Sequence, residues 1–104
     1  MIKISVMYPN TANAKFDHDY YRQTHMPLVK DRLGAACSHY SIDKGIGGGA
    51  PGSAPTYIAM CHIFSDSVSS FEAGMAKHGA EIIGDVANFT DLTPLMQISE
   101  VVVA

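Results

Sequence analysis

The stretch FDHDYYRQTHMPLVKDRLG, residues 16–34, decides the fold of this chain. Asp17 stands where a helix N-cap would stand, and Gly34 stands where a helix commonly ends. At about 100° per residue, one face of such a helix carries Tyr21, His25, Leu28 and Val29. The sequence therefore predicts a helix over residues 17–33, with the imidazole of His25 in the middle of its inward stripe.

Pro27 lies inside this predicted helix and has no amide hydrogen to donate to the carbonyl of Gln23. We therefore expect the helix to kink or restart near His25. A kink is a place where a buried side chain can be turned toward a cavity. Two interpretations of His25 follow: a core histidine satisfied by a hydrogen bond, or a titratable group at the floor of a ligand pocket.

The bulk composition indicates one domain, residues 1–104, with an adequate core. Hydrophobic residues make up 47% of the chain and charged residues only 16%, and a domain this poor in charge usually buries part of its surface against a second copy or a partner. The net charge is −3 and Lys and Arg form no cluster, which argues against nucleic acid and anionic membranes as partners.

The sequence shows no signal-peptide pattern and no apolar run long enough to span a bilayer. We therefore expect a cytoplasmic protein whose two cysteines, Cys37 and Cys61, are reduced. The five histidines are scattered, and neither a C-x-x-C nor an H-x-x-x-H pair occurs. The sequence predicts no metal site and no cofactor, although ligands far apart in a chain can converge in space.

Apolar alternation and β-branched runs predict strands over residues 2–8, 36–44, 56–64 and 95–103. A second helix is expected after Asp66 or Ser67, ending at Gly79 and followed by a short turn over 80–86. The order strand–helix–strand–strand–helix–strand is typical of the ferredoxin-like α+β fold, one four-stranded antiparallel sheet with both helices on one face.

The predicted strands 56–64 and 95–103 are apolar on both faces, although the helices cover only one face of the sheet. A second copy of the chain is the simplest cover for the other face, which predicts a homodimer. Covering several hundred Å² of apolar surface is worth several kcal/mol at roughly 25 cal/mol per Å².

The segment GIGGGAPGSAP, residues 45–55, is a long Gly/Pro-rich loop. It lacks the G-x-x-x-x-G-K-[ST] and G-x-G-x-x-G patterns and opens no helix, so it does not read as a phosphate cradle. We expect a flexible lid or hairpin arm.

Several of these segments together resemble the EthD-domain family. They are the start MIKISVMYPN, the pattern F-x-x-x-Y-Y-x-x-x-H-M-P-L-V over 16–29, the Gly-rich loop, AMCH at 59–62, and A-E-I-I-G-D-V-x-N-F-T-D over 80–91. The resemblance covers nearly the whole chain. It implies a dimeric α+β barrel, in which two ferredoxin-like units pair their sheets, a fold shared by small monooxygenases, haem-degrading enzymes, muconolactone isomerases and polyketide cyclases.

The resemblance also implies candidate catalytic residues. His25 stands where the helix histidine of the family stands. A related lactone methylisomerase uses that histidine, a tyrosine on the second strand and a cysteine on the third, and Tyr40 and Cys61 are the approximate matches. The same enzyme has a loop histidine that residues 45–55 lack, so the same lactone chemistry is not implied.

A pocket between helix and sheet is the natural site for a small apolar or aromatic ligand. The predicted substrate-binding residues are Tyr8, Tyr21, Met60 and His62, the last two on the opposite strand face. These candidate residues and Cys61 also have purely structural interpretations. They are ordinary packing for the tyrosines and Met60, an inert buried thiol for Cys61, and contact with a dimer partner for His62.

Three functions are compatible with these observations. The first is a cofactor-independent oxidoreductase or isomerase of a degradation or oxidation pathway, with His25 as general acid/base on a small aromatic or lactone-like compound and a tyrosine holding the oxyanion. The second is a non-catalytic binding or accessory protein that carries a small hydrophobic metabolite for an oxidase system. The third is haem binding through His25 or His62.

Overall fold

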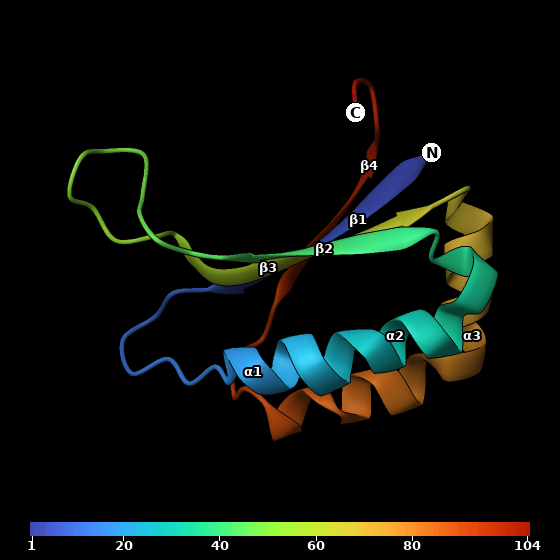
Figure 1. The fold of residues 1–104 in the computed structure, drawn as a ribbon, viewed down its shortest axis with the longest axis horizontal. Coiled ribbons are helices and arrows are strands. Elements are labelled where there is room, and N and C mark those ends of the chain that lie inside the picture. Colours follow the sequence, from blue (N-terminus) through green and yellow to red (C-terminus); the bar gives the residue numbers. More distant parts are fainter.

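The computed structural model describes residues 1–104. The main elements are β1 (Ile2–Pro9), α1 (His18–Tyr20), a π-helical turn (Tyr21–His25), α2 (Met26–Leu33), β2 (His39–Lys44), β3 (Tyr57–Ser65), α3 (Val68–Gly84) and β4 (Leu95–Glu100). The strands form one antiparallel sheet in the order β2-β3-β1-β4. All helices lie on one side of this sheet (Figure 1), so the predicted ferredoxin-like α+β fold is confirmed.

The helix predicted from residues 16–34 forms in three consecutive pieces. Asp17 caps it, because its carboxylate accepts a hydrogen bond from the Tyr20 amide at 3.0 Å. Residues 21–25 make a wider π-helical turn, and α2 restarts at Met26 with Pro27 in its first turn. A proline cannot continue the preceding hydrogen-bond ladder, which is the reason for a restart at the expected place.

The π turn changes which residues face the core. An extra residue per turn rotates the following side chains by about 100° relative to a continuous α-helix. Met26 is therefore buried, at 1% exposure, whereas Leu28, which the regular spacing placed on the inward stripe, is only half-buried. Tyr21, His25 and Val29 are buried as predicted.

Three predicted element ends were wrong. Helix α3 continues past Gly79 to Gly84, since Gly79 does not adopt the left-handed backbone conformation with which a glycine commonly ends a helix. Strand β2 begins only at His39, because residues 34–36 form a 3₁₀ turn that closes with a bond from the Cys37 amide to the Gly34 carbonyl. Strand β4 ends at Glu100 rather than at residue 103, because its partner β1 begins at Ile2, the residue opposite Glu100.

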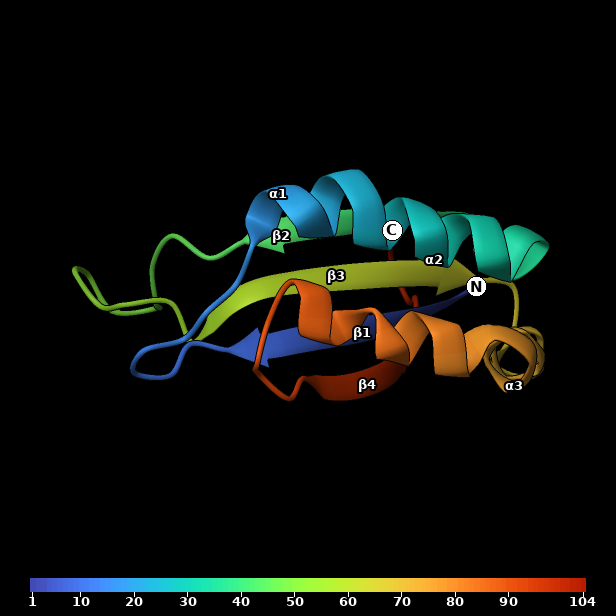
Figure 2. The same cartoon turned by 90° about the horizontal axis from the view of Figure 1, so that it is seen from below.

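The two faces of the sheet have different surroundings. Figure 2, seen from the helix side, shows α2 running along β2 and β3, with α3 beside β1 and β4. Ile4 and Tyr8 of β1 and Ala59, Cys61 and Ile63 of β3 point into this layer and are buried. The other face carries no helix, and its apolar side chains from β1, β3 and β4 are Met7, Ile58, Met60, Phe64 and Leu95.

The Gly-rich loop, residues 45–55, forms an arm that extends away from the body of the domain (Figure 1). A hydrogen bond of 3.0 Å from the Gly48 amide to the Ser53 carbonyl closes it. Gly45 is required at its base, because a Cβ there would lie 2.2 Å from the Tyr57 carbonyl oxygen.

No helix in the structure combines the length and apolar character needed to cross a bilayer.

Candidate functional site

A cavity of about 110 Å³ lies between the helices and the covered face of the sheet. Its walls come from β1, β3, α2, α3 and the start of β4, and 13 of its 15 lining residues are hydrophobic. An engineered apolar cavity of roughly 150 Å³ holds a benzene ring, so the space suits a ligand of about one ring. The cavity reaches the surface beside Ile83 and Met96, which are 66% and 57% exposed.

Four of the seven residues predicted from the sequence meet in this cavity: Tyr8, Tyr21, His25 and Cys61. Tyr8 comes from β1, Tyr21 and His25 from the π turn, and Cys61 from β3. The rings of Tyr21 and His25 are stacked, with centroids 5.6 Å apart and planes 12° apart. Because the π turn spans these two residues, it is the local feature that presents both rings to one space.

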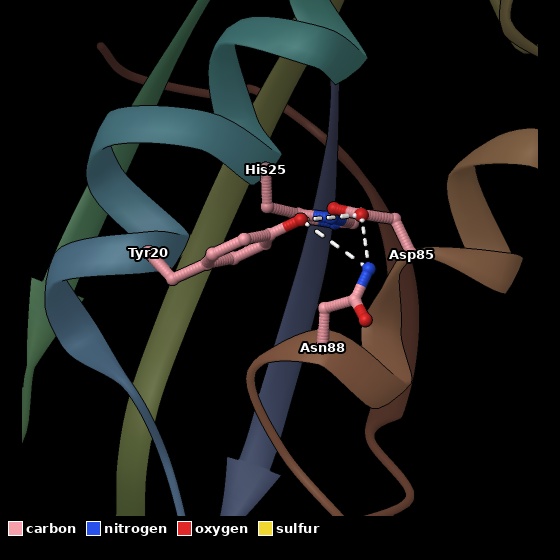
Figure 3. Close-up of polar contacts among 4 residues, drawn as sticks. All are labelled: Tyr20, His25, Asp85 and Asn88. Carbon is pink, nitrogen blue, oxygen red and sulfur yellow. Dashed lines mark hydrogen bonds and ion pairs between the residues drawn. The ribbon is translucent and has the colours of Figure 1, made fainter.

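A polar network of Tyr20, Asp85 and Asn88 lies on the Nδ1 side of the His25 ring (Figure 3). His25 Nδ1 lies 2.9 Å from Asp85 Oδ2. The other carboxylate oxygen, Oδ1, accepts hydrogen bonds from the Tyr20 hydroxyl at 2.6 Å and the Asn88 amide at 2.9 Å. Asp85 follows the last residue of α3, so the network ties the first helical segment to the end of the second.

The network sets the protonation states of Asp85 and His25. Burial of Asp85 favours its neutral form, but hydrogen bonds from Tyr20, His25 and Asn88 outweigh burial and hold the pKa of this carboxyl below its usual range. Burial lowers the pKa of His25, and the neighbouring Asp85 only partly offsets that effect. At neutral pH Asp85 is therefore ionised and His25 is neutral.

This pairing assigns the proton on the neutral imidazole of His25. An ionised carboxylate only accepts hydrogen bonds, so Nδ1 carries the hydrogen that is donated to Asp85. Nε2 then bears a lone pair, and it makes no hydrogen bond within the chain. Every fully buried side-chain nitrogen or oxygen in the structure has a partner, so the unbonded Nε2 is open to the cavity that His25 lines. The arrangement offers a base in an apolar space.

The other polar groups of the cavity keep their protons at neutral pH. Burial raises the pKa of Tyr8 and of Tyr21, and the nearby Cys61 raises both further. Burial also raises the pKa of the Cys61 thiol to about 11. Both tyrosines therefore keep the hydroxyl hydrogens that they can donate, Tyr21 with the Cys61 sulfur beside it, and Cys61 is a protonated thiol rather than a thiolate nucleophile.

A scan against protein families matches residues 9–93 to the EthD domain. The chain belongs to the EthD-domain family. An EthD-like protein from Ralstonia eutropha JMP134 is 56% identical, with 98% of this chain and 92% of that chain covered and a TM-score of 0.95. This confirms the family to which the sequence motifs pointed.

Two more distant solved structures share the fold. An ethyl tert-butyl ether D (EthD) family protein from Bacillus halodurans C-125 is 22% identical, with 96% and 97% of the two chains covered and a TM-score of 0.72. A dimeric ferredoxin-like protein from Thermobifida fusca YX is 14% identical, with 93% and 87% covered and a TM-score of 0.54. None of the curated proteins matches the chain.

The other three predicted site residues of this EthD domain lie outside the cavity. Tyr40, on edge strand β2, lines a separate hollow beside His18 and Lys44. Met60 and His62 lie on the helix-free face, as their place in β3 predicted. His62 there bonds the Ser5 hydroxyl through Nδ1 at 2.8 Å and the Asp43 carboxylate through Nε2 at 3.1 Å. Tyr40, Met60 and His62 therefore do not share the cavity of His25 within this chain.

Sequence reasoning missed the three residues that orient His25: Tyr20, Asp85 and Asn88. Asp85 is 60 residues from His25 in the chain, so no local spacing connects the two. The one available signal was the EthD-like segment over 80–91, which contains an aspartate and an asparagine three residues apart just after the helix. No group of three or more His, Cys, Asp and Glu side chains in the structure could hold a metal ion.

Proposed function

We propose that this EthD domain is a cofactor-independent enzyme of isomerase type that moves a proton on a small aromatic or lactone-like compound. One observation carries the proposal: the Asp85-bound His25 presents an unprotonated Nε2 to an apolar cavity of about one ring. A general base needs a pKa near or below the working pH and a dry place in which to act. Because both cysteines are free thiols, we also propose a reducing, cytoplasmic location.

In the proposed reaction, His25 Nε2 removes a proton from a carbon next to the substrate carbonyl. The electron pair of that C–H bond moves into an enolate, whose oxygen accepts hydrogen bonds from the Tyr8 and Tyr21 hydroxyls. Asp85 stabilises the imidazolium ion that forms, through the hydrogen bond at Nδ1. The imidazolium then returns the proton to a different carbon, which completes an isomerisation without oxidant or cofactor.

The test uses α-angelica lactone, a single-ring β,γ-unsaturated lactone that becomes its α,β-unsaturated isomer by such a proton transfer. In D₂O, the wild-type protein should speed isomerisation and place solvent deuterium on the ring, both visible by NMR. His25→Gln should return the rate to that of buffer. His39→Gln, which changes an exposed histidine of β2 outside the cavity, is the matched control and should keep the full rate. Equal rates for wild type and His25→Gln across a panel of lactones and aromatic ketones would overturn the proposal.

The alternative proposal is a non-catalytic binding or accessory protein that carries a small hydrophobic metabolite for an oxidase system. The almost wholly apolar lining of the cavity favours it. The same NMR samples separate the two. A carrier would show saturable shifts of the cavity residues with no deuterium incorporation, whereas an enzyme of oxidoreductase type would consume the ligand only when oxygen is admitted.

We also propose that the protein is a homodimer through its helix-free sheet face. The support is the exposed Leu95 beside Met7 and Met60 on that face, together with the fold shared with a dimeric ferredoxin-like protein. Met60→Asp should convert a dimer to a monomer in light scattering. Ile83→Asp, on the helix side, should leave the mass unchanged. A monomeric wild-type protein at micromolar concentration would contradict the proposal.

A further inference from the structure

We propose that the His25 cavity selects uncharged single-ring ligands and rejects carboxylates. The preference rests on the proposed function, since it concerns the same site. It goes further because it names the charge of the substrate, which neither the fold nor the proton-transfer chemistry specifies. Three features of the cavity support it: the charge behind His25, the character of the mouth, and the count of polar groups.

The charge closest to the cavity is negative. Asp85 is ionised, and its carboxylate lies directly behind the His25 ring, 2.9 Å from Nδ1. A ligand carboxylate at Nε2 would face this charge across the width of one imidazole. The walls around it are hydrocarbon, so little solvent screens the repulsion. A neutral ligand experiences neither this repulsion nor the cost of burying an ion.

Cations of the helix layer do not offset this negative charge. Arg32, between the two helices, bonds Glu81 through Nε at 2.7 Å and through Nη2 at 3.2 Å. The Lys30 ammonium donates to the Cys37 carbonyl. Neither side chain lines the cavity. With His25 neutral, an anion that enters the cavity finds no counter-charge there.

The mouth and the polar groups favour a neutral carbonyl compound. Ile83 and Met96 flank the opening as largely exposed apolar side chains, which suits the approach of an apolar molecule. Inside, Tyr8 and Tyr21 line the cavity and carry neutral hydroxyls that can donate hydrogen bonds, and His25 Nε2 can accept one proton. This set matches a single carbonyl with an acidic neighbouring C–H, whereas a carboxylate brings a full charge that two neutral donors do not compensate.

Acetophenone and benzoate test the inference, because they have nearly the same shape and differ in charge. Binding is measured at pH 8 from the NMR shifts of the cavity residues. We expect acetophenone to bind at least about tenfold more tightly than benzoate. Equal affinity, tighter binding of benzoate, or no binding of acetophenone at the cavity residues would each overturn the inference.

A charge-reversal pair makes the test sharper. Met96→Lys places a cation at the mouth on edge strand β4 and should bring benzoate to within a few-fold of acetophenone. Ile46→Lys adds the same charge on the arm, at a site that is 96% exposed, and should leave both affinities unchanged. The NMR spectra of both variants report whether the fold is kept. Tight acetophenone binding without any proton transfer would refute the proposed function and leave the selectivity standing.

Discussion

Asp85→Asn tests the structural logic of the site without needing a substrate. The asparagine keeps the size of the side chain but removes its charge and turns one acceptor oxygen into a donor NH₂. The two donors on Oδ1, Tyr20 and Asn88, require a carbonyl oxygen there, so the NH₂ group will face His25 Nδ1. His25 must then accept at Nδ1 and carry its hydrogen on Nε2, which removes the lone pair from the cavity.

The expected loss of stability comes from the hydrogen bonds of Asp85, which no longer involve a charged acceptor in the asparagine variant. A hydrogen bond to a charged group contributes about 1.5–3 kcal/mol and a neutral one about 0.5–1.5 kcal/mol, so each loses about 1 kcal/mol. Three such bonds meet at Asp85, which gives about 3 kcal/mol as an upper figure. The Asp85 side chain is 14% exposed, and this access to water reduces the expected loss to about 2 kcal/mol.

Two measurements check this prediction. A loss of about 2 kcal/mol in a domain of this size lowers the melting temperature by about 8–16 °C, measured at one fixed protein concentration. Long-range ¹H–¹⁵N NMR identifies which imidazole nitrogen of His25 carries the hydrogen. The reasoning is refuted if the variant melts within about 2 °C of wild type. It is also refuted if its His25 remains protonated at Nδ1.

The pH dependence of this difference has a definite sign. The folded pKa of Asp85 lies below the unfolded value of about 3.9, so the carboxylate contributes its stability above that pH. The contribution disappears as the pH falls through the lower folded pKa. The stabilities of wild type and Asp85→Asn should therefore converge below about pH 4. A constant difference down to acid pH would point to packing rather than charge.

The other predictions concern the surroundings of the site. Tyr20→Phe removes the 2.6 Å bond to Asp85 and the 3.4 Å bond from the Asn88 amide, so it should lower the midpoint of urea unfolding while His25 keeps its Nδ1 hydrogen; an unchanged midpoint would contradict the role of the Tyr20 hydroxyl. Gly45→Ala should destabilise the domain by more than about 1 kcal/mol, because its Cβ would clash with the Tyr57 carbonyl, whereas Gly49→Ala, with open space around it, should be neutral. Cys61, with its raised pKa of about 11, should react with Ellman's reagent at pH 8 only after denaturation; rapid reaction of the folded protein would show an accessible thiolate. The proton-transfer rate should be constant above neutral pH and fall in acid as His25 is protonated, at a pH below the usual histidine value of about 6.5; a fall already at neutral pH would contradict the lowered pKa.

Much of the fold could be read from the sequence because it depends on local periodicity. Alternation gave the strands and helical spacing gave the two helical layers. Pro27 marked the restart of the first helix, since the loss of an amide donor acts at the residue itself. The errors lay where another part of the chain sets the end of an element: the ladder between β4 and β1 stops at the pair of Glu100 and Ile2, which the sequence of β4 alone does not show. Leu28 was misplaced because a π turn changes the phase of the helix, which a regular spacing cannot show.

For the candidate site too, local sequence pattern determined some features and tertiary packing the others. The sequence alone determined that His25 lies on a buried stripe with Tyr21, and that Cys61 and His62 face opposite sides of one strand. Only the tertiary structure decided that Tyr8, Tyr21, His25 and Cys61 share one cavity while Tyr40 does not. It alone placed Asp85 against His25, across 60 residues of chain. Side-chain direction is a local property of backbone geometry, but the partner that assigns a proton to a histidine is chosen by the packing of two helices.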